Sequence, residues 1–183
     1  MNLLKKMIHP GLDSTEGFAF ERTTARGIIL KGEEILLMYT KYYNDYSFPG
    51  GGVDSKEDLI TGLKRELLEE TGAQDIEVLS GFGYIDEYRP HYKKEYDLVH
   101  MESYFYFCKT SEEFVEPTLE GYEKNNGMEA EWINIFDAIK HNNNVIKNKE
   151  PSMGFSINRE TYVLETIAGK LFTNSEKHEK TRA

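Results

Sequence analysis

The chain has 183 residues, enough for one domain with a buried core and too few for two domains of ordinary size. Its formal net charge of −10 at pH 7 argues against a protein that grips nucleic acid by charge, and the single Cys108 excludes a disulfide framework within the chain. No apolar run approaches the roughly 18 residues that span a membrane, and residues 1–11 lack the apolar stretch of a secretory signal. We therefore expect a cytoplasmic protein that binds neither nucleic acid nor membrane, with its oligomeric state open, a homodimer included.

Alternating apolar and polar residues predict strands in the first part of the chain. Residues 1–19 are expected to form an irregular lead-in with a short strand or helix at 3–8, and the domain itself is expected over 20–172. Lys31-Gly32 separates two alternating runs, which indicates a β-hairpin. The expected elements are hairpin strands at 23–30 and 34–39 and a short strand at 46–48 that leads to a proline.

A glycine-rich segment and a helical apolar pattern follow. Pro49 and the glycines at 50–52 predict a loop, because glycine takes backbone conformations that are closed to other residues. From about Glu57 the apolar residues recur at helical spacing, and the helix is expected to end at Gly72. The apolar face of this helix consists of Ile60, Leu63 and Leu67.

The second half of the chain predicts three more strands and two helices. Gly81 and Gly83 indicate a bulge in the first of these strands. The expected elements are a strand within 75–88, a charged loop at 87–97, a strand at 100–109, a polar connection at 111–126, a strand at 128–133 that contains Trp132, a short helix at 135–139 ended by the asparagines at 142–144, a loop at 145–155 and a helix at 158–172. The polar tail, 173–183, is expected to be disordered.

Three carboxylates leave the same side of the helix that begins near Glu57. Glu66, Glu69 and Glu70 stand at i, i+3 and i+4, and like charges at this spacing repel. Arg65 can pair with Glu69, but one guanidinium does not neutralise the group. Oxygen ligands of this kind select Mg²⁺ or Mn²⁺ over zinc. The pattern therefore predicts a divalent-cation site.

The stretch 51–73 resembles the signature of the Nudix family, G-x5-E-x7-R-E-U-x-E-E-x-G-U, in which U is an aliphatic residue. Lys56 departs from the many family members that have glycine before the first glutamate. The resemblance implies a single-domain α/β fold, with a mixed sheet between helices in an α/β/α sandwich, and a MutT-like pyrophosphohydrolase activity. The residues that fit in register are Gly51, Glu57, Arg65, Glu66, Leu67, Glu69, Glu70 and Gly72, with Ala73 as a small last member.

The resemblance also implies roles for the matching residues. The three glutamates of the helix would bind Mg²⁺, or Mn²⁺, helped by the backbone carbonyl of Gly50, and Glu69 and Glu70 also belong to the implied catalytic set. Glu57 and Arg65, which also belong to the implied catalytic set, would hold the carboxylates in place. The implied reaction is hydrolysis of a diphosphate linkage in a nucleoside diphosphate joined to another moiety, such as a nucleotide sugar, ADP-ribose or an NTP. A metal-activated water would attack phosphorus, and a carboxylate would take its proton.

Side chains outside the signature are candidates for gripping this small-molecule substrate. Arg26 falls in the predicted strand beside the signature, and Tyr46 could stack on a nucleobase. Arg89 belongs to the charged loop at 87–97, the one local concentration of positive charge near the predicted site. The alternatives are a solvent-facing arginine, a tyrosine that caps the core and a solvated loop, and they stay open.

The carboxylate that would take the proton is not assigned by spacing. Family members often carry a tryptophan in the last strand, with a nearby loop glutamate that serves as general base or extra metal ligand. Glu120, Glu123 and Glu129 are the candidates for this role, and Glu123 is included in the implied catalytic set. Each of them also fits an ordinary surface glutamate.

Two other functions remain open at this stage. A Nudix domain that has lost catalysis would bind a nucleotide as a sensor. An isomerase acting on a prenyl diphosphate would need a reactive cysteine and an acid beside the metal, and Cys108 falls within a predicted strand. The signature handles the diphosphate and leaves the base, the sugar and the leaving group undetermined.

Overall fold

The computed structural model describes residues 1–172, so the predicted tail at 173–183 lies outside the described residues. The chain forms two compact units. The first consists of Met1–Ile29 and Pro49–Leu119, and the second consists of Leu30–Phe48 and the described residues from Glu120 onward. Each unit contains its own sheet and at least one helix, so the expected mixed α/β composition is present in both.

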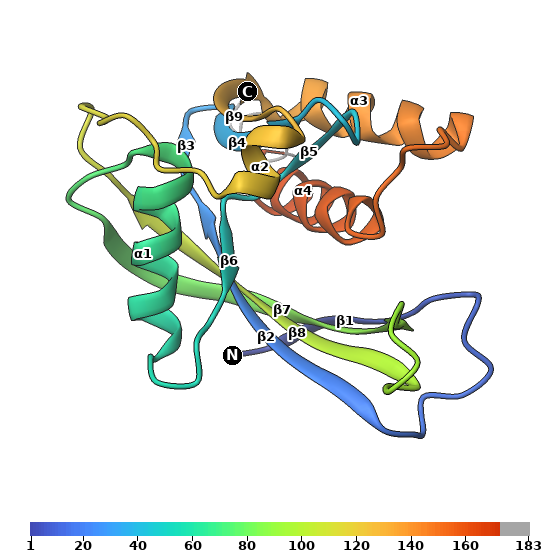
Figure 1. Ribbon diagram of the computed structural model, residues 1–183. Helices are drawn as coiled ribbons and strands as arrows, with labels where there is room; N and C mark the ends of the chain where they lie inside the picture. Colours follow the sequence, from blue (N-terminus) through green and yellow to red (C-terminus); the bar gives the residue numbers. More distant parts are fainter. Residues whose placement is uncertain (173–183) are drawn as a thin grey trace. The chain divides into compact units, whose positions relative to one another are not determined.

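The first unit is built on a five-stranded mixed sheet (Figure 1). Two pairs of strands are parallel, β1 with β7 and β2 with β8, while β7 and β8 are antiparallel to each other and β6 is antiparallel to β2. In spatial order the strands are β1 (Leu3–Ile8), β7 (Glu77–Pro90), β8 (Leu98–Lys109), β2 (Ala19–Ile28) and β6 (Gly50–Gly52). The short strand or helix expected at 3–8 is therefore a strand, β1, which pairs with the long strand β7 at the edge of the sheet, with one shift of register between Leu3 and Lys5.

The helix of the first unit, α1 (Leu59–Thr71), lies against β2 and β6. It begins two residues later than expected from Glu57, because Asp58 acts as the N-cap and its side chain accepts hydrogen bonds from the backbone N–H groups of residues 60 and 61. Gly72 ends the helix in the left-handed conformation with φ of +74°, as predicted. Leu63 and Leu67 are fully buried, so the expected apolar face is the one that packs.

Strand β7 shows both a confirmed expectation and a correction. The register of β7 on β8 shifts between Val78 and Ser80 and again between Gly81 and Gly83, which confirms the predicted bulge. The strand then continues to Pro90, so the first four residues of the expected loop at 87–97 are strand. Their pairing with β8 outweighs their charged character, because strand pairing uses the backbone.

The second unit contains a four-stranded sheet and three helices. The central strand β4 (Glu34–Thr40) pairs with β3 (Leu30–Lys31), β5 (Asp45–Ser47) and β9 (Met128–Asn134). The predicted hairpin of 23–30 with 34–39 is therefore wrong for most of its length, because only β3 pairs with β4 while β2 belongs to the other sheet. Alternation shows that a segment is a strand but not which strand it joins.

The helices of the second unit are α2 (Gly121–Asn125), α3 (Ile135–Asn148) and α4 (Ile157–Leu171). Helix α4 agrees with the expected helix at 158–172, whereas α3 continues through the asparagines expected to end it and through the first four residues of the loop expected at 145–155. Asn142 is fully buried, and its side chain accepts from the Tyr46 N–H and donates to the Tyr46 carbonyl, both at 2.9 Å. An asparagine whose amide is satisfied by another strand no longer competes with its own helix.

Candidate active site

Strand β6 replaces the loop that was expected for the three glycines. It pairs with β2 through Arg26 opposite Gly50 and Ala25 opposite Gly51. Gly50 has φ of +125°, and a Cβ atom there would collide with the Ala25 carbonyl. A Cβ at Gly51 would overlap the carboxylate of Glu66. The glycines therefore serve the close approach of this strand to β2 and α1.

Arg65 is the centre of the charged groups on α1. Its Nη2 atom lies 2.7 Å from Glu57 Oε1, and its Nη1 atom lies 2.7 Å from Glu66 Oε1 and 3.1 Å from Glu69 Oε2. Nη2 also donates to the carbonyl of Gly52 at 3.0 Å, which ties α1 to β6. Hydrogen bonding, first with Glu57 and then with Glu66, raises the pKa of Arg65 above its usual value. Three carboxylates thus share one guanidinium, and the cluster keeps an excess of negative charge.

The remaining acidic side chains of the cluster differ in their surroundings. Glu70 is buried, and its Oε2 accepts the backbone N–H of Gly50 at 2.6 Å, so the end of α1 is fixed to the first glycine. Burial raises the pKa of Glu66, and its contact with Arg65 opposes this rise. The hydrogen bond from Arg65 is the main reason that the pKa of Glu57 is lowered. The signature glutamates are therefore each held at a defined place by a donor of the protein.

The cluster suits a hard divalent cation by the type and charge of its donors. All of the candidate ligands are oxygen atoms, and Glu66 and Glu69 contact the same nitrogen of Arg65, so their carboxylates lie close together. Within residues 1–172, however, no three acidic, histidine or cysteine side chains are gathered around a common point that could hold a metal. Arg65 and the Gly50 N–H group engage these carboxylates. The assignment of a metal ion to this site therefore stays a prediction, which the type and charge of the donor atoms support.

Arg26 lies beside this cluster, as expected from its position in the strand. Its Nη1 donates to the backbone carbonyl of Gly50, the carbonyl that the sequence comparison with the family suggested as a metal ligand. Burial raises the pKa of Glu66, and the charge of Arg26, together with the nearer Arg65, opposes this rise. A carbonyl oxygen has two lone pairs, so this contact leaves one acceptor site on Gly50. Arg26 is therefore brought to the site through the strand rather than through a loop.

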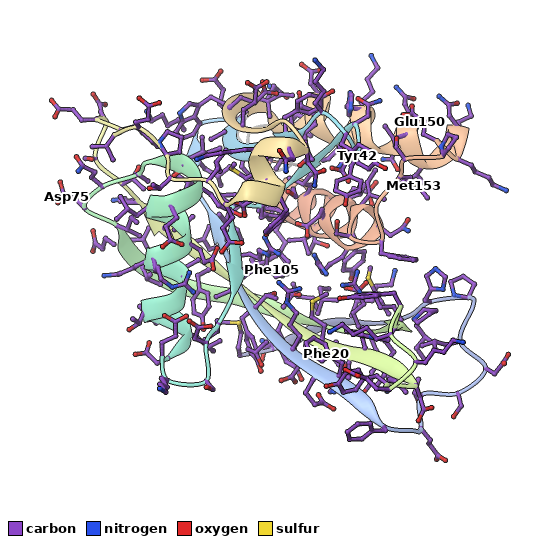
Figure 2. All side chains as sticks on the ribbon, viewed as in Figure 1. Phe20, Tyr42, Asp75, Phe105, Glu150 and Met153 are labelled. Carbon is purple, nitrogen blue, oxygen red and sulfur yellow. The ribbon has the colours of Figure 1, made fainter. Side chains whose placement is uncertain are left out.

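Arg89 is not brought together with the cluster. Arg89 on β7 pairs with Val99 on β8, and Val99 pairs in turn with Phe20 near the start of β2. The glycine strand β6 pairs with the other half of β2, where Gly50 lies opposite Arg26. Six residues of strand separate these two positions on β2, about 20 Å at 3.3 Å per residue. Figure 2 labels Phe20 and Phe105, the partner of Arg26, at different places along this sheet. A contact between Arg89 and a substrate at the cluster is therefore not supported within the first unit.

Tyr46 and Glu123 belong to the second unit, and both are enclosed there. The ring of Tyr46 is 9% exposed and packs against the rings of Tyr39 and His141, each with a centroid distance of 5.1 Å. Glu123 is buried, and its two carboxylate oxygens accept from the backbone N–H of Glu120 at 2.7 Å and from a tyrosine hydroxyl at 3.0 Å. Both side chains therefore have structural partners in the second unit, and their predicted roles stay predictions.

Sequence reasoning missed a set of buried charges in the second unit. Arg159 and Glu160 of α4 are both buried and pair at 2.6 Å, and Glu160 also accepts the Phe48 N–H at 3.2 Å. Asp45, on the strand before Phe48, is 4% exposed, and its pKa is raised to about 7, first by burial and then by the charge of Glu160. An Arg-Glu dipeptide in a helix ordinarily indicates a solvent-facing surface, so the sequence carried no signal for this cluster.

An open cavity of about 590 Å³ lies at the beginning of α1 in the first unit. Its wall includes Glu57, Asp58, Thr23 and Tyr106, and none of the three helix glutamates. Burial, followed by the charge of Asp58, raises the pKa of Tyr106. The cavity therefore adjoins the signature loop and does not open onto the carboxylates of Glu66, Glu69 and Glu70.

The glycine strand, the capped helix and the glutamates around Arg65 define an α/β protein with an acidic signature helix. The model of one family, the NUDIX domain, matches residues 21–153, which is more than half of the chain and includes segments of both units. The chain belongs to the Nudix family.

Relatives and solved structures agree with this membership. A stretch of 45 residues is 40% identical to an RNA pyrophosphohydrolase of Bartonella henselae and covers 25% of this chain and 26% of that protein. A stretch of 37 residues is 54% identical to an RNA pyrophosphohydrolase of Caulobacter vibrioides and covers 20% and 21% of the two chains. The chain thus spans about a quarter of the length of the curated relatives it matches.

A solved structure is similar to this chain in its fold. A NUDIX hydrolase from Nitrosomonas europaea superimposes with a TM-score of 0.51 at 16% identity, over 81% of this chain and 90% of that chain. This likeness confirms the mixed α/β fold class expected from the signature. Within residues 1–172, no helix is long and apolar enough to cross a membrane.

Proposed function

We propose that this chain is a Mg²⁺-dependent pyrophosphohydrolase that cleaves the diphosphate linkage of a nucleoside diphosphate joined to a second group. The observation that carries the proposal is the cluster in which Glu57, Glu66 and Glu69 share the guanidinium of Arg65. Family membership supports it, and so do the partial relatives that are named pyrophosphohydrolases. The fold alone would not, because one fold hosts many activities.

Glu66, Glu69 and Glu70 are the residues that would hold the metal ion, with the Gly50 carbonyl beside them. When bound, Mg²⁺ would neutralise diphosphate charge and supply a water of lowered pKa. The protein contributes a fixed arrangement of donors, because Glu70 is tied to the Gly50 N–H and Arg65 contacts both other ligands.

Arg65 and Glu57 act as positioning residues in this proposal. Arg65 joins α1 to β6 through the Gly52 carbonyl and separates the carboxylates that would otherwise repel. Glu57, which precedes α1, pairs with Arg65, and its Oε1 atom lies 2.7 Å from Nη2 of Arg65. The residue that takes the proton from the attacking water stays unassigned among Glu120, Glu123 and Glu129, and the hydrogen bonds that Glu123 accepts favour a structural role for it.

The test is a substrate panel in Mg²⁺. It comprises ADP-ribose, nucleotide sugars, dinucleoside polyphosphates, ordinary NTPs and an RNA oligonucleotide with a 5′-triphosphate, and release of phosphate or of the nucleoside monophosphate is measured. We expect selective hydrolysis of one class that is lost when the ion is removed with EDTA and restored by Mg²⁺ or Mn²⁺. Turnover that is unchanged in EDTA would overturn the metal-dependent mechanism.

Variants make the test specific to the cluster. Glu70→Gln and Glu69→Gln are expected to lower kcat about 10- to 100-fold, whereas Glu112→Gln, which alters an exposed glutamate elsewhere in the first unit, should leave it unchanged. Activity of the first two variants within a few-fold of the unaltered protein would show that the metal assignment is wrong. No turnover on any substrate, with thermal stabilisation by a nucleotide retained, would instead favour a nucleotide-binding sensor.

A further inference from the structure

A second charged cluster joins three neighbouring strands in the first unit (Figure 1). Its centre is His100 on β8, whose two ring nitrogens both contact carboxylates. Nδ1 lies 2.6 Å from Glu21 Oε2 on β2, and Nε2 lies 2.8 Å from Asp86 Oδ1 on β7. One imidazole therefore bridges the strands on both sides of it.

The surroundings of the ring add one cation and one more carboxylate. The ring of Tyr88 on β7 stacks on His100 with a centroid distance of 4.5 Å and an interplanar angle of 17°. Lys6 on β1 lies 4.5 Å from the Tyr88 ring, and its Nζ atom lies 3.9 Å from Asp86. Glu102 stands two residues further along β8 on the same face and accepts the Tyr104 hydroxyl at 3.1 Å. The cluster thus reaches all four strands from β1 to β2.

The geometry is satisfied by one protonation state of the ring. A neutral imidazole has one N–H group and one lone pair, so one of the two carboxylates would face a lone pair. The imidazolium donates to both carboxylates, and each of these hydrogen bonds joins opposite charges. Partial burial is the largest single contribution and lowers the pKa of His100, but the hydrogen bonds and charges of Asp86 and Glu21 together outweigh it, so the pKa is raised above 6.5.

The place of the cluster on the sheet gives it a mechanical consequence. At Glu21, strand β2 pairs with β8 through the partner His100, while β6 pairs with β2 from Thr24 onward. The first half of β2 therefore has one neighbouring strand on the sheet. A side-chain link across β8 is well placed to hold this half of β2 and the last part of β7 together.

We propose that His100 is a proton-operated clamp that fastens β2 and β7 to β8 when it is charged and loosens them when it is neutral. Because the folded state binds the proton more tightly, the stabilisation is fully present below about pH 6.5 and is lost as the pH rises through the higher value of the folded protein. The clamp does not depend on the proposed hydrolysis, since none of its residues contacts the cluster around Arg65.

The first experiment follows the ring itself by NMR, with the His100 signals assigned through their loss in His100→Gln. The expected midpoint of the titration lies above 6.5, and Glu21→Gln and Asp86→Asn should each lower it. The second experiment measures amide hydrogen exchange of residues 19–22 at several pH values, corrected for the intrinsic rate. Protection should fall about tenfold for each unit by which the midpoint exceeds that of free histidine.

Matched variants decide between the clamp and an ordinary structural histidine. His100→Gln should abolish this fall in protection, and His141→Gln, an alteration in the second unit, should preserve it. If His100→Gln does not fold, Glu21→Gln serves the same purpose, because the Glu21 side chain is 69% exposed and its replacement leaves the core intact. Any of three results would overturn the proposal. The titration midpoint of His100 could lie at or below 6.5, or it could stay unchanged in both Glu21→Gln and Asp86→Asn. The third result is an equal loss of protection with rising pH in His100→Gln and in the unaltered protein.

Discussion

Replacing Gly51 by alanine tests the reasoning about the active site most directly. A Cβ atom at Gly51 would lie 2.5 Å from the carboxylate carbon of Glu66, so that side chain must move. Gly52, the next residue of β6, offers a matched control, because a Cβ there would meet the Arg22 guanidinium at 3.6 Å, which is ordinary contact. Neither glycine has a positive φ, so the backbone of each accepts alanine.

The expected effect on stability is small and the effect on turnover is large. Overpacking in a rigid site costs about 1–3 kcal/mol, and the lower end applies here because the end of a glutamate side chain can turn away. Displacing a group that holds a metal ion costs about 10- to 100-fold in activity or metal affinity. We therefore expect Gly51→Ala to lower kcat by at least tenfold and to raise the Mg²⁺ concentration needed for half-maximal rate, while Gly52→Ala changes both less than threefold.

The assay is a steady-state measurement of kcat and KM on the substrate found in the panel, repeated over a Mg²⁺ titration, with thermal unfolding of both variants. Equal activity of the two alanine variants would refute the inference that Gly51 makes room for the Glu66 carboxylate. A large loss of stability in Gly51→Ala would also refute it, because the effect on turnover would then come from a disturbed fold.

Three further predictions concern stability, and all are measured by urea unfolding. Asp45 has a pKa of about 7 in the folded protein against 3.8 for an ordinary aspartate, so the stability that its protonated form contributes is lost as the pH rises from about 4 to 7. Asp45→Asn should remove this pH dependence and raise the free energy of unfolding by up to about 4 kcal/mol at pH 8. A pH profile equal to that of the unaltered protein would contradict this. Asn142→Leu should cost about 2–4 kcal/mol because it leaves the N–H and the carbonyl of Tyr46 unpaired, and an unchanged midpoint would show that water replaces the amide. Asp58→Ala should cost about 1 kcal/mol through the lost N-cap, while Asp58→Asn should cost little; equal losses would point to charge instead of capping.

The parts of the fold that the sequence predicts well depend on local chemistry. Gly72 marks the end of α1 because a left-handed residue there favours glycine, and the i, i+4 spacing of Arg65 and Glu69 predicts their contact. The signature names the candidate site residues because they belong to one short stretch of the chain, and their roles stay predictions. The glycine segment is a strand instead of a loop because β2 supplies its partner, and no local pattern contains that information.

The parts that the sequence does not predict depend on pairing over long distances. The basic segment at 87–97 predicts that Arg89 lies near the site, but the register of β7 on β8 and of β8 on β2 places it six residues along the sheet from Arg26. Asn142 looked like the end of a helix until the backbone of Tyr46 provided both of its hydrogen-bond partners. The clamp at His100 draws its two carboxylates from different strands, and Glu21 lies 79 residues away in the sequence.

The two parallel pairs of the first sheet have a consequence for the order in which this protein folds. Leu3 pairs with Tyr84, and Ala19 pairs with Leu98. Each of the two N-terminal strands therefore meets its parallel partner only after about 80 further residues have been synthesised. Contacts so distant along the chain require a large loop to close first, and proteins dominated by them fold slowly. During synthesis, β1 and β2 emerge before β7 and β8 exist, and their unpaired backbone edges are exposed for that interval. The hairpin of β7 and β8, whose strands are neighbours in the chain, is the natural template onto which both early strands are later added.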